Sequence, residues 1–221
     1  DRSPSRGLGD VYKRQDIQFH VFNAIKEQAE FHEADSAAAI VLSPNGEILA
    51  LANYPSTDPN NHLNYSADDY RNRVFSDKTE PGSTMKPFTM LLALDKGLIT
   101  ATDDELIDVT KSIGHIPPDG KYFEITIQKI LEKSHNLGTV NISERIEKED
   151  YYLTWKKLGF GESLGIMPRT ENPGVLKHYN SWGLADKRTL SYGYGPMNLN
   201  LAQLARAYLV FANNGALPSL K

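Results

Sequence analysis

Apolar residues near the start of the chain follow a helical period. Four of them recur at every fourth position: Ile17, Val21, Ile25 and Ala29. This spacing places them on one face and predicts an amphipathic helix from Asp16 to near His32.

Two apolar runs, residues 38–42 and 48–52, come next and have the length and composition of buried strands. Pro44-Asn45-Gly46 lies between them, and Asn-Gly tolerates the positive φ angles of a hairpin turn. The pattern therefore predicts an antiparallel hairpin. A helix, a hairpin and then further helices indicate an α+β domain.

Polar and apolar segments alternate after the hairpin. We expect a polar loop over residues 53–79 and then an apolar helix over 88–94 that stops near Gly97. A short helix over 126–133 follows and ends in a polar turn. A last helix begins after its cap, Asn200, and ends before Gly215. Four residues lie at helical spacing before Gly159: Tyr151, Tyr152, Trp155 and Leu158. Such an aromatic stripe is typical of a core rather than of a ligand-binding site.

The composition fits one folded domain. The 221 residues are 40% hydrophobic and 24% charged, which is enough apolar material for a core and too much for a disordered chain. The longest apolar run, residues 37–42, is far shorter than a membrane-spanning helix. A net charge of −4 argues against nucleic acid as a partner.

Cysteine and histidine usage removes several kinds of site. The chain has no cysteine, which excludes disulfides, thiolate metal sites and cysteine nucleophiles. Its 6 histidines show no metal-ligand spacing, so no metal site is expected.

Residues 1–15 differ from the rest because they show neither helical nor strand periodicity. They resemble translated adapter sequence, and we expect a non-native leader there, with a natural flexible linker as the alternative. Neither interpretation gives this stretch any chemistry. Residues 16–221 then form the single domain.

Ser83 and Lys86 stand three residues apart where the apolar helix opens, so their side chains are expected on one face. A serine hydroxyl needs a base to become a nucleophile, and a lysine desolvated by apolar neighbours can lose its proton and act as that base. Backbone N–H groups at a helix start suit a developing oxyanion. The alternative is an N-cap serine followed by an exposed lysine, although no other Ser-x-x-Lys occurs in the chain.

Ser134 and Asn136 form a second candidate element, in the break after the helix over 126–133. Ser134 can relay a proton between Lys86 and a leaving group, and the Asn136 amide can both donate to and accept from a peptide. The alternative is a polar turn, because Ser43-Pro44-Asn45 has the same pattern in the hairpin. His135 is expected to be a loop side chain rather than a base.

These motifs resemble those of a known family. Ser83-Thr84-Met85-Lys86 and Ser134-His135-Asn136 are similar to the first two active-site motifs of penicillin-binding proteins and serine β-lactamases. Residues 80–87 resemble the nucleophile segment of class B penicillin-binding proteins, most closely the septal, cell-division type. Further segments resemble the same class in the same order: residues 50–55, 58–60, 71–73, 191–195, 203–208 and 213–215.

The resemblance implies an antiparallel sheet with helices on both sides, and a D,D-transpeptidase that cross-links peptidoglycan through an acyl-serine and is covalently inhibited by β-lactams. It implies that Ser83 is the nucleophile, Lys86 its base, Ser134 the proton relay and Asn136 a substrate-orienting group. No cofactor or metal is implied. The implied partners are D-Ala-D-Ala stem peptides, β-lactams and, for the full-length family, a septal glycosyltransferase and other division proteins. The implied location is the outer face of the bacterial inner membrane.

The family's third motif, Lys-Thr/Ser-Gly on a sheet strand, has no match in the chain. We therefore expect a fragment of a longer product that lacks the C-terminal strands, the membrane anchor and the non-catalytic pedestal domain. Without the third motif, such a fragment is expected to be inactive or impaired.

Two other functions stay open. A β-lactam-hydrolysing or β-lactam-sensing relative has the same Ser-x-x-Lys but needs a deacylating base, so the deacylation rate separates it from a transpeptidase. A non-catalytic interaction domain of the same fold needs neither Ser83 nor Lys86, and both are present.

Overall fold

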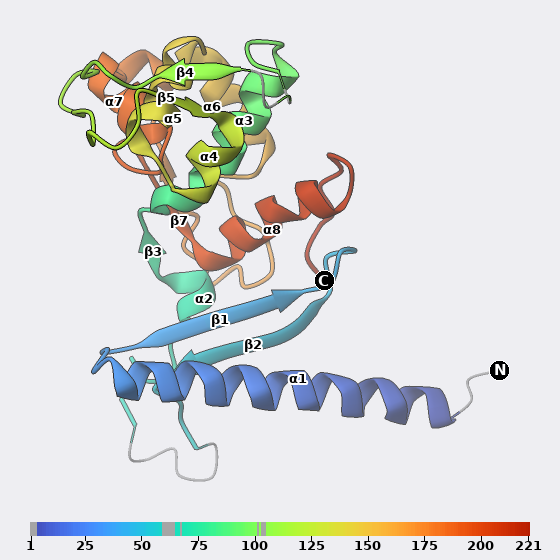
Figure 1. Ribbon diagram of the computed structural model, residues 1–221. Helices are drawn as coiled ribbons and strands as arrows, with labels where there is room; N and C mark the ends of the chain where they lie inside the picture. The colour runs from blue at the N-terminus through green and yellow to red at the C-terminus, as the bar shows by residue number, and fades with distance from the viewer. Residues whose placement is uncertain (1–3, 59–64, 67, 101, 103–104) are drawn as a thin grey trace. The chain divides into compact units, whose positions relative to one another are not determined.

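The computed structural model of the protein describes residues 4–58, 65–66, 68–100, 102 and 105–221 (Figure 1). The chain divides into two compact units. The hairpin unit comprises Asp1–Lys78, Ser163–Pro173 and Asn200–Lys221. The helical unit comprises Thr79–Glu162 and Gly174–Leu199.

The hairpin unit contains α1 (Pro4–Phe31), β1 (Ala37–Leu42), β2 (Ile48–Tyr54), α2 (Arg73–Ser76) and α8 (Leu201–Ala212). The helical unit contains η2 (Gly82–Met85), α3 (Lys86–Asp95), β4 (Leu106–Asp108), β5 (Glu124–Thr126), α4 (Ile127–Glu132), α5 (Asn136–Glu144), α6 (Lys148–Lys157), β6 (Val175–Leu176), η3 (Tyr179–Ser181) and α7 (Leu184–Leu190). The chain passes between the units within β3 (Lys78–Thr79), after Glu162, after Pro173 and within β7 (Met197–Asn200). The predicted α+β class is confirmed.

The predicted hairpin is confirmed as an antiparallel pair of β1 and β2, with Ala37 opposite Tyr54. Gly46 takes φ 86° in the turn, a backbone region that favours glycine. The side chains of β1 and β2 alternate between two faces of the ladder. Helix α1 runs along one side of the hairpin, and α2 and α8 lie on the other (Figure 1). Helices therefore cover both sides of this antiparallel ladder, as the resemblance implied.

Helix α1 ends at Phe31, close to the predicted end, but begins at Pro4 rather than near Asp16. A helix can continue beyond its apolar period, because extending a helix costs little once its first turn exists. The Gln18 side chain of α1 forms two hydrogen bonds with the hairpin. Its Nε2 donates to the Leu51 carbonyl at 2.8 Å, and its Oε1 accepts from the Leu51 N–H at 2.9 Å.

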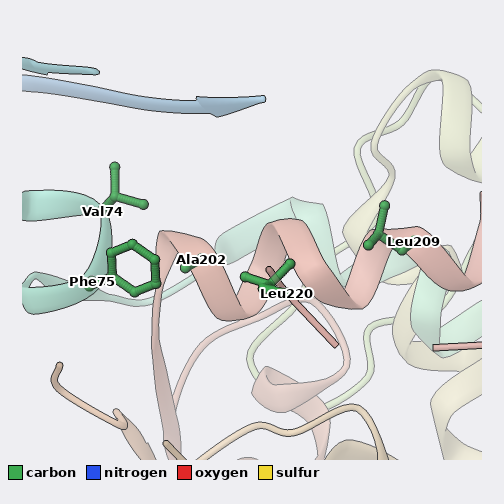
Figure 2. Packing of buried hydrophobic residues seen from close by; sticks show 5 residues of the cluster. All are labelled: Val74, Phe75, Ala202, Leu209 and Leu220. Carbon is green, nitrogen blue, oxygen red and sulfur yellow. The ribbon is translucent and has the colours of Figure 1, made fainter. Parts of the chain in front are cut away.

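A cluster of buried apolar residues forms the core of the hairpin unit: Val74, Phe75, Ala202, Leu209 and Leu220 (Figure 2). Side chains of β1 at positions 38, 40 and 42 pack against it. Asn200 caps α8 as predicted, because its side chain accepts from the Gln203 N–H at 2.8 Å while the Gln203 side chain accepts from the Asn200 N–H at 3.0 Å.

The aromatic stripe of α6 is buried in the core of the helical unit, as predicted. Tyr151 and Trp155 are fully buried, and Trp155 forms a triangle with Phe88 and Phe160 whose ring centroids lie 6.1–6.5 Å apart. Edge-to-face packing at this distance stabilises a core beyond the area that it buries. Tyr152, by contrast, is only half-buried.

Several elements were not predicted from the sequence. Strands β4 and β5 pair with Ile107 opposite Ile125, and β6 and β7 pair with Leu176 opposite Met197. Strands of two or three residues are too short to show a period of two. The polar loop over 53–79 contains α2, and its residues 59–64 and 67 lie outside the described part. Of the helices that the structure describes, none has both the length and the apolarity to cross a bilayer.

Candidate active site

Ser83 lies in the 3-10 turn η2, immediately before α3, and its side chain is exposed. The sequence predicted it at the helix opening, and Pro87 explains why this opening is a 3-10 turn. Proline has no N–H to bond the Ser83 carbonyl four residues back, so the Lys86 N–H bonds it instead. Residues three apart are nearly eclipsed in a 3-10 turn, which aligns Ser83 with Lys86.

Lys86 is buried, with 1% of its surface exposed, although it opens α3. Its Nζ donates to the Ser134 carbonyl, to Ser134 Oγ at 2.9 Å and to Asn136 Oδ1 at 2.6 Å. The structure thus brings together three of the four predicted site residues. No hydrogen bond engages the Ser83 hydroxyl within the described residues.

Burial lowers the pKa of Lys86 from 10.5 to about 8. Removing an ammonium from water disfavours the charged form, and the three acceptors around Nζ are neutral. A lysine with this pKa is partly unprotonated near neutral pH, as a general base must be.

Ser134 and Asn136 reach Lys86 from the loop between α4 and α5. Ser134 has φ 51°, in the left-handed region that non-glycine residues rarely occupy. This backbone conformation turns both the carbonyl and the hydroxyl of Ser134 toward Nζ. Such a conformation persists only where its surroundings hold it, and it is common at functional sites.

His135 lies in the predicted loop and is not among the hydrogen-bond partners of Lys86 Nζ, but its side chain is buried rather than a free loop side chain. Its Nδ1 accepts from the Gly138 N–H at 3.0 Å and caps α5. The expected break at residues 133–138 is therefore short, because α5 already begins at Asn136.

The segment from Ser191 to Gly195 packs against the turn that carries Ser83. The Gly82 N–H donates to the Gly193 carbonyl at 3.0 Å, and the Gly195 N–H donates to Glu80 Oε1 at 3.1 Å. Thr89 Oγ1 donates to the Ser191 carbonyl at 2.7 Å. These contacts hold the turn that carries Ser83 in place, and they come from a segment outside η2 and α3.

Only the family resemblance singled out residues 191–195, and the spacing of chemical groups did not. Gly193 has φ 89°, and a β-carbon there would meet the Gly82 carbonyl oxygen at 2.0 Å. Closely spaced glycines in a short segment were the signal in the sequence for such a close approach.

The site consists of the turn that carries Ser83, a buried lysine of lowered pKa, and the Ser134 hydroxyl and Asn136 amide that accept hydrogen bonds from that lysine. This set can deprotonate a serine and pass a proton onward, which is the chemistry of acyl transfer. The described residues contain no group of three or more histidine or acidic side chains arranged to hold a metal ion.

Residues 37–221 match the family described as "Penicillin binding protein transpeptidase domain". The chain is 35% identical over 221 residues to "Probable peptidoglycan D,D-transpeptidase PenA" of Neisseria gonorrhoeae, covering 98% of this chain and 38% of that protein. It is 31% identical over 201 residues to "Peptidoglycan D,D-transpeptidase FtsI" of Escherichia coli K12, covering 90% of this chain and 34% of that protein. The chain thus spans well under half the length of these relatives.

A comparison with solved structures indicates the same family. The transpeptidase domain of Burkholderia pseudomallei penicillin-binding protein 3 superposes with a TM-score of 0.79 at 31% identity, over 92% of this chain and 58% of that chain. Since the family match covers most of the sequence, the chain belongs to the penicillin-binding protein transpeptidase domain family.

Proposed function

We propose that the protein is a serine D,D-transpeptidase domain that cross-links peptidoglycan and is acylated by β-lactams. The observation that carries the proposal is the buried Lys86, whose Nζ meets Ser134 and Asn136 one 3-10 turn from Ser83. The names of the relatives PenA and FtsI, both peptidoglycan D,D-transpeptidases, support the substrate class.

In the first step, Ser83 Oγ attacks the carbonyl carbon of the penultimate D-alanine while its proton passes to neutral Lys86. The developing oxyanion faces the backbone N–H groups of the turn that opens α3. The carbon–nitrogen bond to the terminal D-alanine then breaks. The leaving amine takes a proton that Lys86 supplies through the Ser134 hydroxyl.

The hydrogen bonds of Lys86 support this proton path. As an ammonium, Lys86 donates to three acceptors. As a neutral amine it keeps two N–H groups and gains a lone pair, which can accept the Ser83 proton. The Asn136 amide is then free to orient the backbone of the bound peptide.

In the second step, an amine from a neighbouring stem peptide attacks the acyl-serine. It loses a proton to Lys86, the new amide bond forms as the ester bond to Ser83 Oγ breaks, and Lys86 returns the proton to Ser83 Oγ. A β-lactam follows the first step, with ring opening in place of departure of D-alanine. No step needs a cofactor.

Peptidoglycan lies outside the cytoplasmic membrane, so we place the working domain on the outer face of the bacterial inner membrane. Association with a septal glycosyltransferase and other division proteins stays a prediction from the resemblance to the septal type.

Fluorescent penicillin labelling of the 221-residue protein, with mass spectrometry of the labelled peptide, tests the proposal. We expect the label on Ser83 at a rate reduced by the missing third motif, no labelling of Ser83→Ala, and the same labelling as wild type for Ser112→Ala, which removes a serine outside the site. Labelling that survives Ser83→Ala would remove Ser83 from the mechanism.

A further inference from the structure

His135 stands in the chain between the two residues that hold Lys86, and its side chain is 7% exposed. Its Nδ1 accepts a hydrogen bond from the Gly138 N–H at 3.0 Å. An imidazole nitrogen that accepts carries no proton, so the neutral ring carries its proton on Nε2. The geometry therefore defines the tautomer.

The Nε2 side of the ring faces an acidic group. Nε2 lies 3.5 Å from Asp119 Oδ2, and the Tyr122 ring packs edge-on against the imidazole with centroids 5.9 Å apart. The Lys121 N–H donates to Asp119 Oδ1 at 2.9 Å and is the main cause that holds the pKa of Asp119 below its usual range. Asp119 thus faces the ring as a carboxylate, although Nε2 forms no hydrogen bond with it or with any other described residue.

The backbone of His135 is fixed on both sides as well. Its N–H donates to the Ile130 carbonyl at 2.9 Å, which ties it to α4. Its carbonyl accepts from Thr139 Oγ1 at 2.9 Å, which ties it to α5. Ser134, one residue earlier, has the unfavourable φ of 51° and needs such support.

We propose that His135 is a positioning residue: by capping α5 and facing Asp119, its imidazole holds Ser134 and Asn136 against Lys86 Nζ. The kinetic consequence rests on the proposed acylation of Ser83, whereas the structural consequence does not. The role depends on an acceptor at this position, so another side chain able to cap a helix should replace the histidine.

Three variants test this role. His135→Ala removes the cap of α5, and His135→Asn supplies a different capping acceptor. Thr126→Ala is the matched control, because Thr126 caps the neighbouring helix α4 by accepting from the Lys129 N–H at 3.2 Å. All three changes lie in the helical unit.

Amide hydrogen exchange gives the structural readout. We expect exchange at the Gly138 amide to accelerate at least about tenfold in His135→Ala and to stay near wild type in His135→Asn. Thr126→Ala should accelerate exchange at Lys129 and leave Gly138 unchanged. Unchanged Gly138 exchange in His135→Ala would overturn the proposal.

Penicillin acylation gives the kinetic readout, with the first-order acylation constant separated from the binding constant. His135→Ala should lower the acylation constant at least about tenfold, because small displacements of a catalytic group are costly. His135→Asn should restore it, and Thr126→Ala should leave it within about twofold. If His135→Asn is as slow as His135→Ala, or if Thr126→Ala is equally slow, His135 has no positioning role. A wild-type protein that is never acylated, together with the expected Gly138 exchange, would reject the proposed function and leave the positioning role intact.

Discussion

The carbonyl oxygen of Gly82 lies 2.0 Å from the place that a β-carbon on Gly193 would occupy. Gly82 directly precedes the candidate nucleophile, and its N–H donates to the Gly193 carbonyl. Two segments far apart in the sequence therefore meet backbone to backbone at the residue that precedes Ser83. Any side chain at position 193 must push them apart.

We expect Gly193→Ala to lower penicillin acylation at least about a hundredfold, because the turn that presents Ser83 has to move. Gly97→Ala is the control, since Gly97 also has a positive φ, 65°, with nothing within 4 Å of its β-carbon position. It should cost about 1–2 kcal/mol of stability through backbone strain and leave acylation unchanged. If both variants lose acylation equally, the loss comes from the backbone strain of a positive φ and not from the close approach of Gly193 to Gly82.

The pH profile of acylation should follow Lys86. Burial lowers the pKa of Lys86 to about 8, so the neutral fraction rises almost tenfold from pH 6 to pH 7 and levels off above about pH 8. Stopped-flow acylation with a fluorescent penicillin measures the profile. Lys187→Met is the control and should keep the wild-type pH profile. Burial also lowers the pKa of Lys187, but its side chain lies outside the site. A flat profile from pH 6 to 8 would contradict Lys86 as the base.

Lys86→Met should abolish acylation and yet stabilise the fold at pH 7. The folded pKa of Lys86, about 8, lies below the value of 10.5 expected in the unfolded chain, so the unfolded state binds more protons between these values. Wild-type stability therefore rises with pH across that window and is lowest below pH 8. The gain in Lys86→Met is up to about 3 kcal/mol at pH 7 and vanishes near pH 10.5. Urea unfolding at both pH values checks this, and a gain independent of pH would contradict the cause.

Phe160→Ala should destabilise the helical unit by about 3–5 kcal/mol, because it opens a cavity against Phe88 and Trp155. Phe123→Ala removes the same ring from a site that is 83% exposed and should cost less than about 0.5 kcal/mol. Thermal unfolding of both variants gives the comparison. Similar losses would mean that the aromatic triangle is not a core.

Local chemistry made part of the structure predictable. The Asn45-Gly46 turn predicted the hairpin, and Asn200 as a cap predicted the start of α8, because both signals act within four residues. The 3-10 turn at Ser83 follows from Pro87 in the same way, although the sequence analysis placed Ser83 only at a helix opening.

Contacts between distant segments could not be predicted from spacing. Lys86 and Ser134 are 48 positions apart. Before the family resemblance, a proton relay between them was only one interpretation, with a polar turn as the alternative. Nothing local distinguished Ser134 from Ser43, which stands in the same Ser-x-Asn pattern in the hairpin turn. The burial of His135 was also hidden, since it depends on the more distant residues Asp119 and Tyr122, which lie against its ring.

The hairpin unit also has a consequence for the order in which the chain folds. The β1–β2 hairpin belongs to the first segment of this unit, yet the Ile48 N–H donates to the Lys221 carbonyl and the Lys221 N–H donates to the Gly46 carbonyl, each at 3.0 Å. A ribosome makes the hairpin long before it makes that partner, and the whole helical unit emerges in between. Until then the hairpin has an open edge and an incomplete core, the kind of surface that chaperones bind during synthesis.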